Sequence, residues 1–165
     1  MFIEPLAQSE RFRQSVEGPI GWFTVVADAQ AVVHTEWGRA PARPSPVTEA
    51  AAEQLKAFFA GTLRDFDLPL APRGSAHELA VWEQLCRIPF GETITYGELA
   101  RRSASVARAV GGTCGANPIA IIIPCHRVTA AGGALRGYSG HGGPDTKRKL
   151  LALEARIANS FALTA

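Results

Sequence analysis

The chain has 165 residues, of which 47% are hydrophobic and 19% are charged, and its formal net charge is +2. This length suits one domain or two small ones, and the composition excludes an intrinsically disordered chain. No apolar run approaches the roughly 20 residues of a membrane span, and the first residues lack the basic start and apolar core of a signal peptide.

The first elements predicted along the chain are two strands and a helix. Strands are expected over residues 22–27 and 31–37, joined by a turn at 28–30. Ser45 is the predicted N-cap of a helix that has Pro46 at its first position, the place in a helix where proline is favoured. A glycine at position 61 is expected to end this helix.

A short third strand is predicted over residues 66–70, where Phe66, Leu68 and Leu70 alternate with other residues. Two prolines and a glycine then indicate a linker that ends near residue 75. We therefore expect an α+β protein. Residues 1–75 should form a small α/β module with antiparallel strands, and residues 76–165 a second module.

The second module predicts a helix-turn-helix. The module opens with a helix that has Leu79, Trp82, Leu85 and Cys86 on one face. Thr95 and Glu98 then have the spacing of a capping box, which starts a helix over 96–102. A very short turn leads to another helix over 106–112, which is rich in small residues. Such a surface suits either a nucleic-acid groove or tight helix packing, and the module is expected to be winged-helix-like.

Cys125 follows the apolar run 119–123, which predicts a buried strand, and Pro124, which would end that strand. A catalytic thiol needs a rigid position and positively charged surroundings, and His126 and Arg127 come directly after it. Taken alone, Cys125 fits an inert buried cysteine better than a catalytic one, since free cysteine is among the most buried residue types.

The C-terminal segment predicts a glycine-rich loop over 137–143 and a last helix capped by Asp145. Glu154 lies on the apolar face of that helix, together with Leu150, Leu153 and Ile157. A carboxylate buried there without a partner would be costly, so we expect a histidine or arginine near Cys125 to pair with it.

The three cysteines have no paired spacing, so neither a disulfide framework nor a metal site is expected, and a reducing cytoplasm fits. Cys86 and Cys114 are predicted to be core thiols. Residues 1–75 carry 7 basic and 9 acidic side chains, whereas residues 76–165 carry 10 basic and 6 acidic ones. The basic half, which contains Cys125, allows but does not require a polyanionic partner such as nucleic acid.

These motifs together resemble the O6-alkylguanine-DNA alkyltransferase family. The matching segments appear in family order: Val81-Trp82, Ile88-Pro89-Phe90-Gly91-Glu92-Thr93, Tyr96, Ala107-Arg108-Ala109-Val110-Gly111, Asn117-Pro118, Pro124-Cys125-His126-Arg127-Val128, Gly137-Tyr138 and Leu150-Leu151-Ala152-Leu153-Glu154. Gly18-Pro19-Ile20-Gly21 also resembles the start of the family's N-terminal strands.

The resemblance implies a single-use methylated-DNA–protein-cysteine methyltransferase. Cys125 would take the alkyl group from O6 of guanine, assisted by His126 through a water molecule and by Glu154, which orients the histidine. Asn117 would hold the backbone near Cys125, and Tyr96 would donate a hydrogen bond to N3 of the guanine. The base pocket would be formed by Tyr138, by Ser139 and by the carbonyl groups of Cys125 and Val128.

The resemblance also implies binding to double-stranded DNA through the minor groove, with the damaged base flipped out. Arg108 would fill the gap in the stack, and Ala107, Ala109, Gly111 and Tyr96 would lie against the DNA. No cofactor, metal, membrane or obligate protein partner is expected, and the protein should be a cytoplasmic monomer.

The sequence departs from the family at three places: the turn 103–105 is short, His77 replaces the usual phenylalanine, and Ala120 stands where some members have proline. The alternatives are a non-catalytic DNA-binding protein, namely a lesion sensor or a sequence-specific winged-helix regulator, and a cysteine hydrolase. A sensor of the alkyltransferase-like type would lack the reactive cysteine. A regulator would need more base-reading side chains than the segment 106–112 offers.

Overall fold

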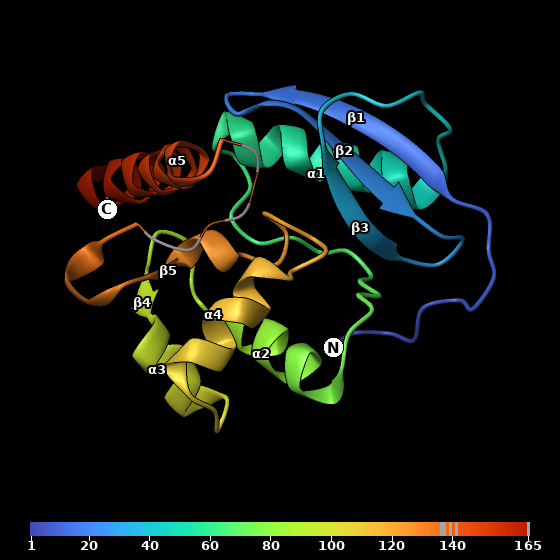
Figure 1. Cartoon of the computed structure of the whole chain (residues 1–165). Coiled ribbons are helices and arrows are strands. Elements are labelled where there is room, and N and C mark those ends of the chain that lie inside the picture. The colour runs from blue at the N-terminus through green and yellow to red at the C-terminus, as the bar shows by residue number, and fades with distance from the viewer. Residues whose placement is uncertain (136–137, 139, 141, 165) are drawn as a thin grey trace. The chain divides into compact units, whose positions relative to one another are not determined.

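The computed structural model describes residues 1–135, 138, 140 and 142–164, with side chains up to residue 160. The chain forms two compact units, Met1–Gly74 and Ser75–Ala165. Figure 1 shows the elements of each unit. Mixed α+β architecture, as predicted from the sequence, is confirmed.

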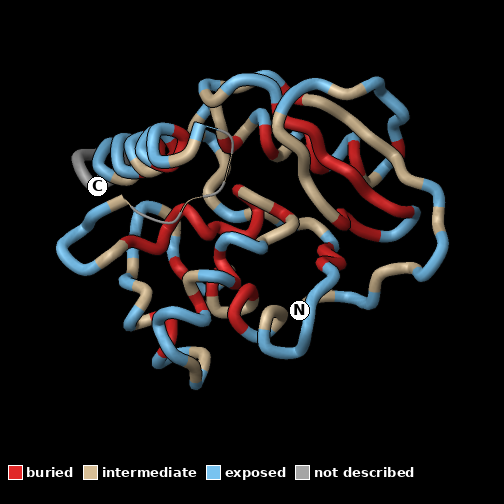
Figure 2. The backbone as a smooth tube through the Cα atoms, in the orientation of Figure 1, coloured by how far each residue is buried: buried red, intermediate tan, exposed pale blue. Residues whose placement is uncertain are grey.

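The first unit is built on an antiparallel sheet of three strands in the order β1 (Phe12–Gly18), β2 (Gly21–Ala27) and β3 (Val32–Trp37). Helix α1 (Pro46–Ala60) packs against this sheet. The core between them is fully buried and apolar, and Figure 2 shows the buried residues that run along β2. It includes Val16, Phe23, Val25, Leu55 and Phe58.

The predicted ends of α1 are confirmed by their hydrogen bonds. Ser45 is the N-cap and accepts a hydrogen bond from the backbone N–H of Thr48, which completes a capping box. Gly61 is the C-cap with φ 80°, a left-handed conformation that glycine adopts without steric cost.

Two predictions about strands in this unit are wrong. Strand β1 was not expected, because residues 12–18 contain four polar side chains and do not alternate clearly. The predicted strand over 66–70 does not form, apart from a single bridge between Leu70 and Val32. Pro69 lies in this segment and has no N–H to donate to a sheet, although its carbonyl accepts from the backbone N–H of Val32.

The second unit contains the helix-turn-helix and a small parallel sheet. Its elements are α2 (Ala76–Cys86), β4 (Ile94–Thr95), α3 (Tyr96–Arg102), α4 (Ala107–Gly115), η1 (Cys125–Arg127), β5 (Val128–Thr129), η2 (Ala131–Gly133) and α5 (Pro144–Thr164). Strands β4 and β5 pair in parallel. Thr95 caps α3 as predicted, by accepting from the backbone N–H of Glu98.

The starts of two helices in this unit are fixed by local contacts. Helix α2 begins at Ala76, because Ser75 and Glu78 form a capping box that the sequence analysis missed. Helix α5 begins at Pro144, so Asp145 lies inside its first turn and accepts a hydrogen bond from Arg148. The predicted glycine-rich loop includes residues 137, 139 and 141, which lie outside the described residues.

The predicted strand over 119–123 is also wrong, although the segment is largely buried as expected. Its backbone folds back on itself: Ile122 N–H donates to the Ala120 carbonyl at 2.9 Å, and Ile123 N–H donates to the Ile119 carbonyl at 2.9 Å. Ile121 has φ 71°, a strained conformation for a β-branched residue. The apolar run 119–123 therefore predicted burial correctly, but it did not predict the backbone conformation.

Within the described part of the chain, no helix is both long and apolar enough to cross a lipid bilayer.

Candidate active site

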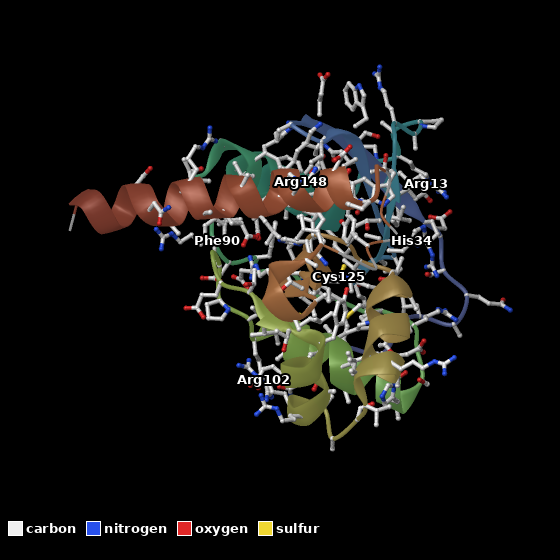
Figure 3. The ribbon with its side chains drawn as sticks, turned by 60° about the vertical axis from the view of Figure 1, so that its left-hand side comes forward. Arg13, His34, Phe90, Arg102, Cys125 and Arg148 are labelled. Atoms are coloured by element: carbon white, nitrogen blue, oxygen red, sulfur yellow. The ribbon has the colours of Figure 1, made fainter. Side chains whose placement is uncertain are left out.

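Cys125 is the first residue of η1, directly after Pro124, and only 7% of its surface is exposed. Its backbone N–H donates to the Ile123 carbonyl at 2.8 Å. Figure 3 shows Cys125 within the second unit, whereas Arg102 lies exposed on α3. The thiol is thus held at a fixed corner of the backbone.

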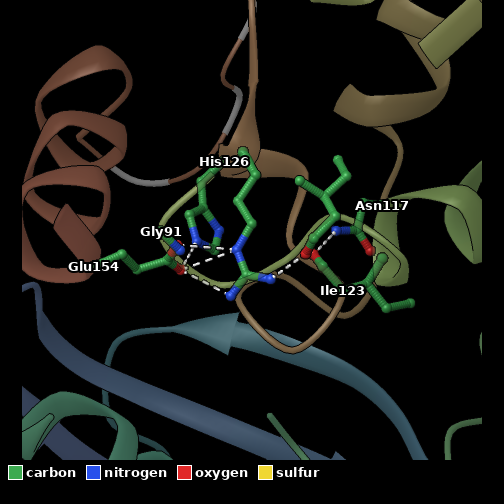
Figure 4. Close-up of polar contacts among 7 residues, drawn as sticks. Gly91, Asn117, Ile123, His126 and Glu154 are labelled. Carbon is green, nitrogen blue, oxygen red and sulfur yellow. Dashed lines mark hydrogen bonds and ion pairs between the residues drawn. The ribbon is translucent and has the colours of Figure 1, made fainter. Parts of the chain in front are cut away.

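The side chain of Asn117 bonds to the backbone before Cys125, where the sequence analysis expected it to act. Its Nδ2 donates to the Ile123 carbonyl at 2.8 Å (Figure 4). Its Oδ1 accepts from the backbone N–H of Ile119 at 3.0 Å. One side chain therefore bonds to both ends of the folded-back segment that precedes Cys125.

His126, Arg127 and Glu154 form a buried network beside the thiol. His126 Nε2 lies 2.7 Å from Glu154 Oε1, and Arg127 contacts both carboxylate oxygens at 3.0 to 3.1 Å. The Gly91 N–H donates to Glu154 Oε2 at 3.0 Å, and Arg127 Nη1 donates to the Ile88 carbonyl at 2.7 Å (Figure 4). Glu154 was expected to pair with a histidine or an arginine, and it pairs with both His126 and Arg127.

The charge state of this network follows from its contacts. Burial acts to raise the pKa of Glu154, but the hydrogen bonds and charges of His126 and Arg127 outweigh it and lower the pKa to about 2. Burial lowers the pKa of His126 despite Glu154, so its imidazole is neutral near pH 7. An ionised carboxylate only accepts hydrogen bonds, which assigns the proton to Nε2 and leaves Nδ1 as a proton acceptor.

Nδ1 of His126 is buried and has no hydrogen-bond partner among the described residues. A neutral imidazole with one nitrogen fixed by a carboxylate and the other able to accept a proton has the chemistry of a general base.

The position of Gly91 depends on its being glycine. Its φ is +81°, and an added Cβ would lie 2.8 Å from the Cβ of Ala158. The absence of a side chain lets the backbone approach α5 closely enough for its N–H to reach Glu154.

Burial and two neighbouring groups act in opposite directions on the Cys125 thiol. Burial raises the pKa of Cys125, while a hydrogen bond from Asn117 and the charge of Lys147 oppose this rise. Burial also raises the pKa of Tyr96 to about 12 and that of Cys114 to about 12, so both are protonated near pH 7. The hydroxyl of Tyr138 is buried without a hydrogen-bond partner among the described residues.

Lys147 is the residue that the sequence analysis missed. Its side chain is 0% exposed, and its Nζ lies 5.7 Å from the centre of the Tyr96 ring. In the sequence Lys147 belongs to a basic run that suggests an exposed surface. The available signal was its spacing of three from Leu150 and seven from Glu154, which places all three on one face of the helix.

The residues predicted to contact DNA lie mainly on the exposed side of α4. Ala107, Arg108 and Ala109 are exposed and Gly111 is half-buried, while Val110, Thr113 and Cys114 face the core. Of the predicted pocket residues, Tyr96 is half-buried at the start of α3. Val128 is buried in β5, and Ser139 lies outside the described residues.

The short turn of the helix-turn-helix is tied to α2. Ala104 has φ 49°, Ser105 N–H donates to the Ala100 carbonyl at 2.8 Å, and His77 Nε2 lies 2.9 Å from Ser105 Oγ. His77 of α2 therefore bonds to the turn that joins α3 and α4.

Comparison with known proteins identifies the family. The family model of the DNA-binding domain of 6-O-methylguanine DNA methyltransferase matches residues 76–156. The methylated-DNA–protein-cysteine methyltransferase of Mycolicibacterium paratuberculosis is 44% identical over 153 residues, which cover 87% of this chain and 92% of that protein.

Solved structures agree with this assignment over both units. The crystal structure of Mycobacterium tuberculosis O6-methylguanine methyltransferase is similar with a TM-score of 0.79 and 40% identity, covering 90% of this chain and 94% of that one. The structure of Mycobacterium tuberculosis OGT in complex with DNA has a TM-score of 0.78 and 41% identity, covering 88% and 93%. The chain belongs to the methylated-DNA–protein-cysteine methyltransferase family of DNA-repair proteins.

Proposed function

We propose that this protein repairs O6-alkylguanine in duplex DNA by moving the alkyl group irreversibly to the sulfur of its own Cys125. The observation that carries this proposal is the nearly buried thiol at a fixed backbone corner, beside the buried His126–Glu154 pair. The protein acts as a monomer in the cytoplasm, without a cofactor or metal.

The reaction is an in-line displacement at the alkyl carbon. The thiol proton leaves towards Nδ1 of His126 through a water molecule, and the thiolate attacks the carbon bonded to O6. The S–C bond forms as the C–O6 bond breaks, and the electron pair of that bond stays with guanine. Tyr96 donates a hydrogen bond to guanine N3 and stabilises the developing negative charge.

The product explains why each molecule acts once. A thioether is not hydrolysed by water, and the proposed mechanism has no step that restores the thiol.

The base reaches Cys125 by rotating out of the duplex. Arg108, exposed in the first turn of α4, takes its place in the stack, and the small residues Ala107, Ala109 and Gly111 allow close approach to the minor groove. Tyr138 and the Val128 carbonyl line the base pocket, whereas Ser139, the other pocket residue predicted from the sequence, lies outside the described residues. Residues 76–165 supply both DNA binding and chemistry, and residues 1–75 are a structural module.

Intact mass measurement with an O6-methylguanine duplex tests this function. We expect a permanent mass gain of one methyl group per protein molecule and a plateau at one repaired lesion per molecule. Cys125→Ser should bind the duplex without gaining mass. Binding without mass gain by the unaltered protein would indicate a lesion sensor, and multiple turnover would contradict the single-use mechanism.

A further inference from the structure

The turn between α3 and α4 is a Schellman motif with an alanine in its left-handed position. Ala104 has φ 49°, and its N–H donates to the Arg101 carbonyl at 3.3 Å, while the Ser105 N–H donates to the Ala100 carbonyl at 2.8 Å. Glycine usually occupies this position, because a Cβ makes the left-handed conformation costly. A residue other than glycine keeps such a conformation only where the surrounding contacts hold it.

One of those contacts comes from α2. The residue after the left-handed position is usually apolar and packs back on its own helix. Here it is Ser105, which offers a hydroxyl group instead, and its Oγ lies 2.9 Å from Nε2 of His77. The backbone of His77 is itself fixed, because Ser75 and Glu78 form a capping box around the first turn of α2. The turn is thus bonded to a helix whose start is well defined.

Helix α2 also bonds to the far end of α4. The indole Nε1 of the buried Trp82 donates to the Thr113 carbonyl at 2.9 Å, and α2 packs against both α3 and α4 (Figure 1). Among the described residues, the N-cap of α4, Val106, makes no capping hydrogen bond from its side chain. The start of α4 therefore depends on the turn before it. Two bonds from α2, one at the turn and one near the last residues, set the direction of α4.

We propose that His77 is a positioning residue for base flipping, which acts through Ser105 to set where α4 begins and how it is directed. The proposal rests on the part that the proposed function gives Arg108, which takes the place of the flipped base. Arg108 lies in the first turn of α4, so a displaced turn moves it relative to the minor groove. Cys125 and its network lie on η1 and α5 and do not depend on this bond.

The first test compares two substrates in variants of His77. Alkyl transfer from an O6-methylguanine duplex below saturation and from free O6-benzylguanine is followed by intact mass. His77→Phe keeps a ring of similar size without the bond to Ser105. It should slow the duplex reaction about two- to tenfold, the range that corresponds to one hydrogen bond, and leave the free-base reaction unchanged. His77→Gln, whose amide can bond to Ser105, should recover part of the loss.

Two serines of the same turn supply the controls. Ser105→Ala should reproduce the loss seen in His77→Phe, and the double variant should lose no more than either single variant, because all three lack the same bond. Ser103→Ala is the matched control, since the Ser103 hydroxyl is buried and has no hydrogen-bond partner in the described part of the chain. Its rates on both substrates should equal those of the unaltered protein.

Three results would overturn the proposal. The first is a duplex reaction of His77→Phe that is as fast as that of the unaltered protein. The second is an equal loss on both substrates, which would make His77 merely structural. The third is an additive loss in the double variant, which would show that His77 and Ser105 act separately.

A second measurement uses no DNA. Amide hydrogen exchange followed by NMR should be faster at the Ser105 N–H in His77→Phe, because the turn that bonds it to the Ala100 carbonyl is held less firmly. The indole N–H of Trp82, bonded near the other end of α4, should exchange at an unchanged rate. Unchanged exchange at Ser105 overturns the proposal.

These results are separable from the test of the proposed function. An unaltered protein that gains no alkyl group from the duplex removes the proposed function and with it the part of Arg108, while hydrogen exchange still reports whether His77 holds the turn. Normal transfer by the unaltered protein, together with unchanged exchange and unchanged rates in His77→Phe, removes the inference alone.

Discussion

Arg127 donates to both carboxylate oxygens of Glu154 from two of its nitrogens, Nε and Nη2, at distances within 3.1 Å. Because Arg127 adjoins His126 in the chain, two neighbouring residues of η1 hold one carboxylate of α5. The orientation of the histidine and the docking of the last helix are therefore set by the same buried ion pair.

Glu154→Gln should lower both stability and activity. The substitution leaves the Arg127 charge buried without its partner, and breaking such a pair costs about 3–5 kcal/mol. Urea unfolding at pH 7 measures the loss, and the rate of alkyl transfer should fall because His126 loses its orientation. Glu98→Gln, at a half-buried surface carboxylate bound by Arg101 and Arg102, serves as the control and should leave both quantities near those of the unaltered protein. Equal stability of the two variants would show that Glu154 does not hold η1 to α5.

The free energy of unfolding should fall in acid, over a pH range set by the pKa of Glu154. Its pKa in the folded state is about 2, below its ordinary value of 4.5. A group whose pKa is lowered by folding stabilises the protein fully above its unfolded pKa, and this contribution is lost as the pH falls through the folded one. The free energy of unfolding should thus decrease from about pH 5 towards pH 2. Glu154→Gln should flatten this part of the profile; an equally steep decline in the variant would assign the effect to other carboxylates.

Arg108→Ala should separate base flipping from chemistry. Repair of a duplex should be severely slowed, because unstacking a base costs a few kcal/mol that the arginine no longer offsets. Reaction with free O6-benzylguanine, which needs no flipping, should stay close to normal. Arg148→Ala, at an exposed arginine of α5, is the control for loss of positive charge. Similar losses on both substrates would make Arg108 structural, and no loss on either would direct attention to Arg101 or Arg102.

Alkylation itself should destabilise the protein. Cys125 is 7% exposed and its backbone is fixed by Ile123, so an added group has little room. Overpacking of this kind costs ~1–3 kcal/mol. Melting temperatures before and after complete reaction with a methylated duplex measure the effect, with Cys125→Ser treated identically as the control. A melting temperature that stays equal or rises would contradict a tightly packed site.

The parts of the fold that were predictable from the sequence depend on contacts between near neighbours. The N-caps Ser45 and Thr95 and the closing Gly61 bond to residues within the same turn, so the sequence pattern contains the whole interaction. The partner of Glu154 was predictable in kind, because burying a lone carboxylate is costly wherever it occurs.

The parts that could not be predicted depend on long-range packing. The run 119–123 is apolar because it is buried, but its folded-back conformation is set by Asn117 and not by its own composition. The burial of Lys147 requires α5 to pack over Tyr96, which is 51 positions earlier in the chain. Strand β1 forms against β2 despite its polar side chains, because the pairing satisfies its backbone.

The hydrogen bond from Asn117 to the Ile123 carbonyl has a consequence for the order in which the site is assembled. The hydrogen bonds that fix the backbone at Cys125 join residues within about ten positions of one another. Such local contacts form early in folding, because closing a short loop costs little conformational entropy. Glu154 and Lys147 arrive only with α5, more than twenty residues later in the sequence. A newly made chain thus has its sulfur in position before Glu154 can pair with His126. On the proposed mechanism, the thiol therefore gains its general base in the correct orientation only when folding is complete.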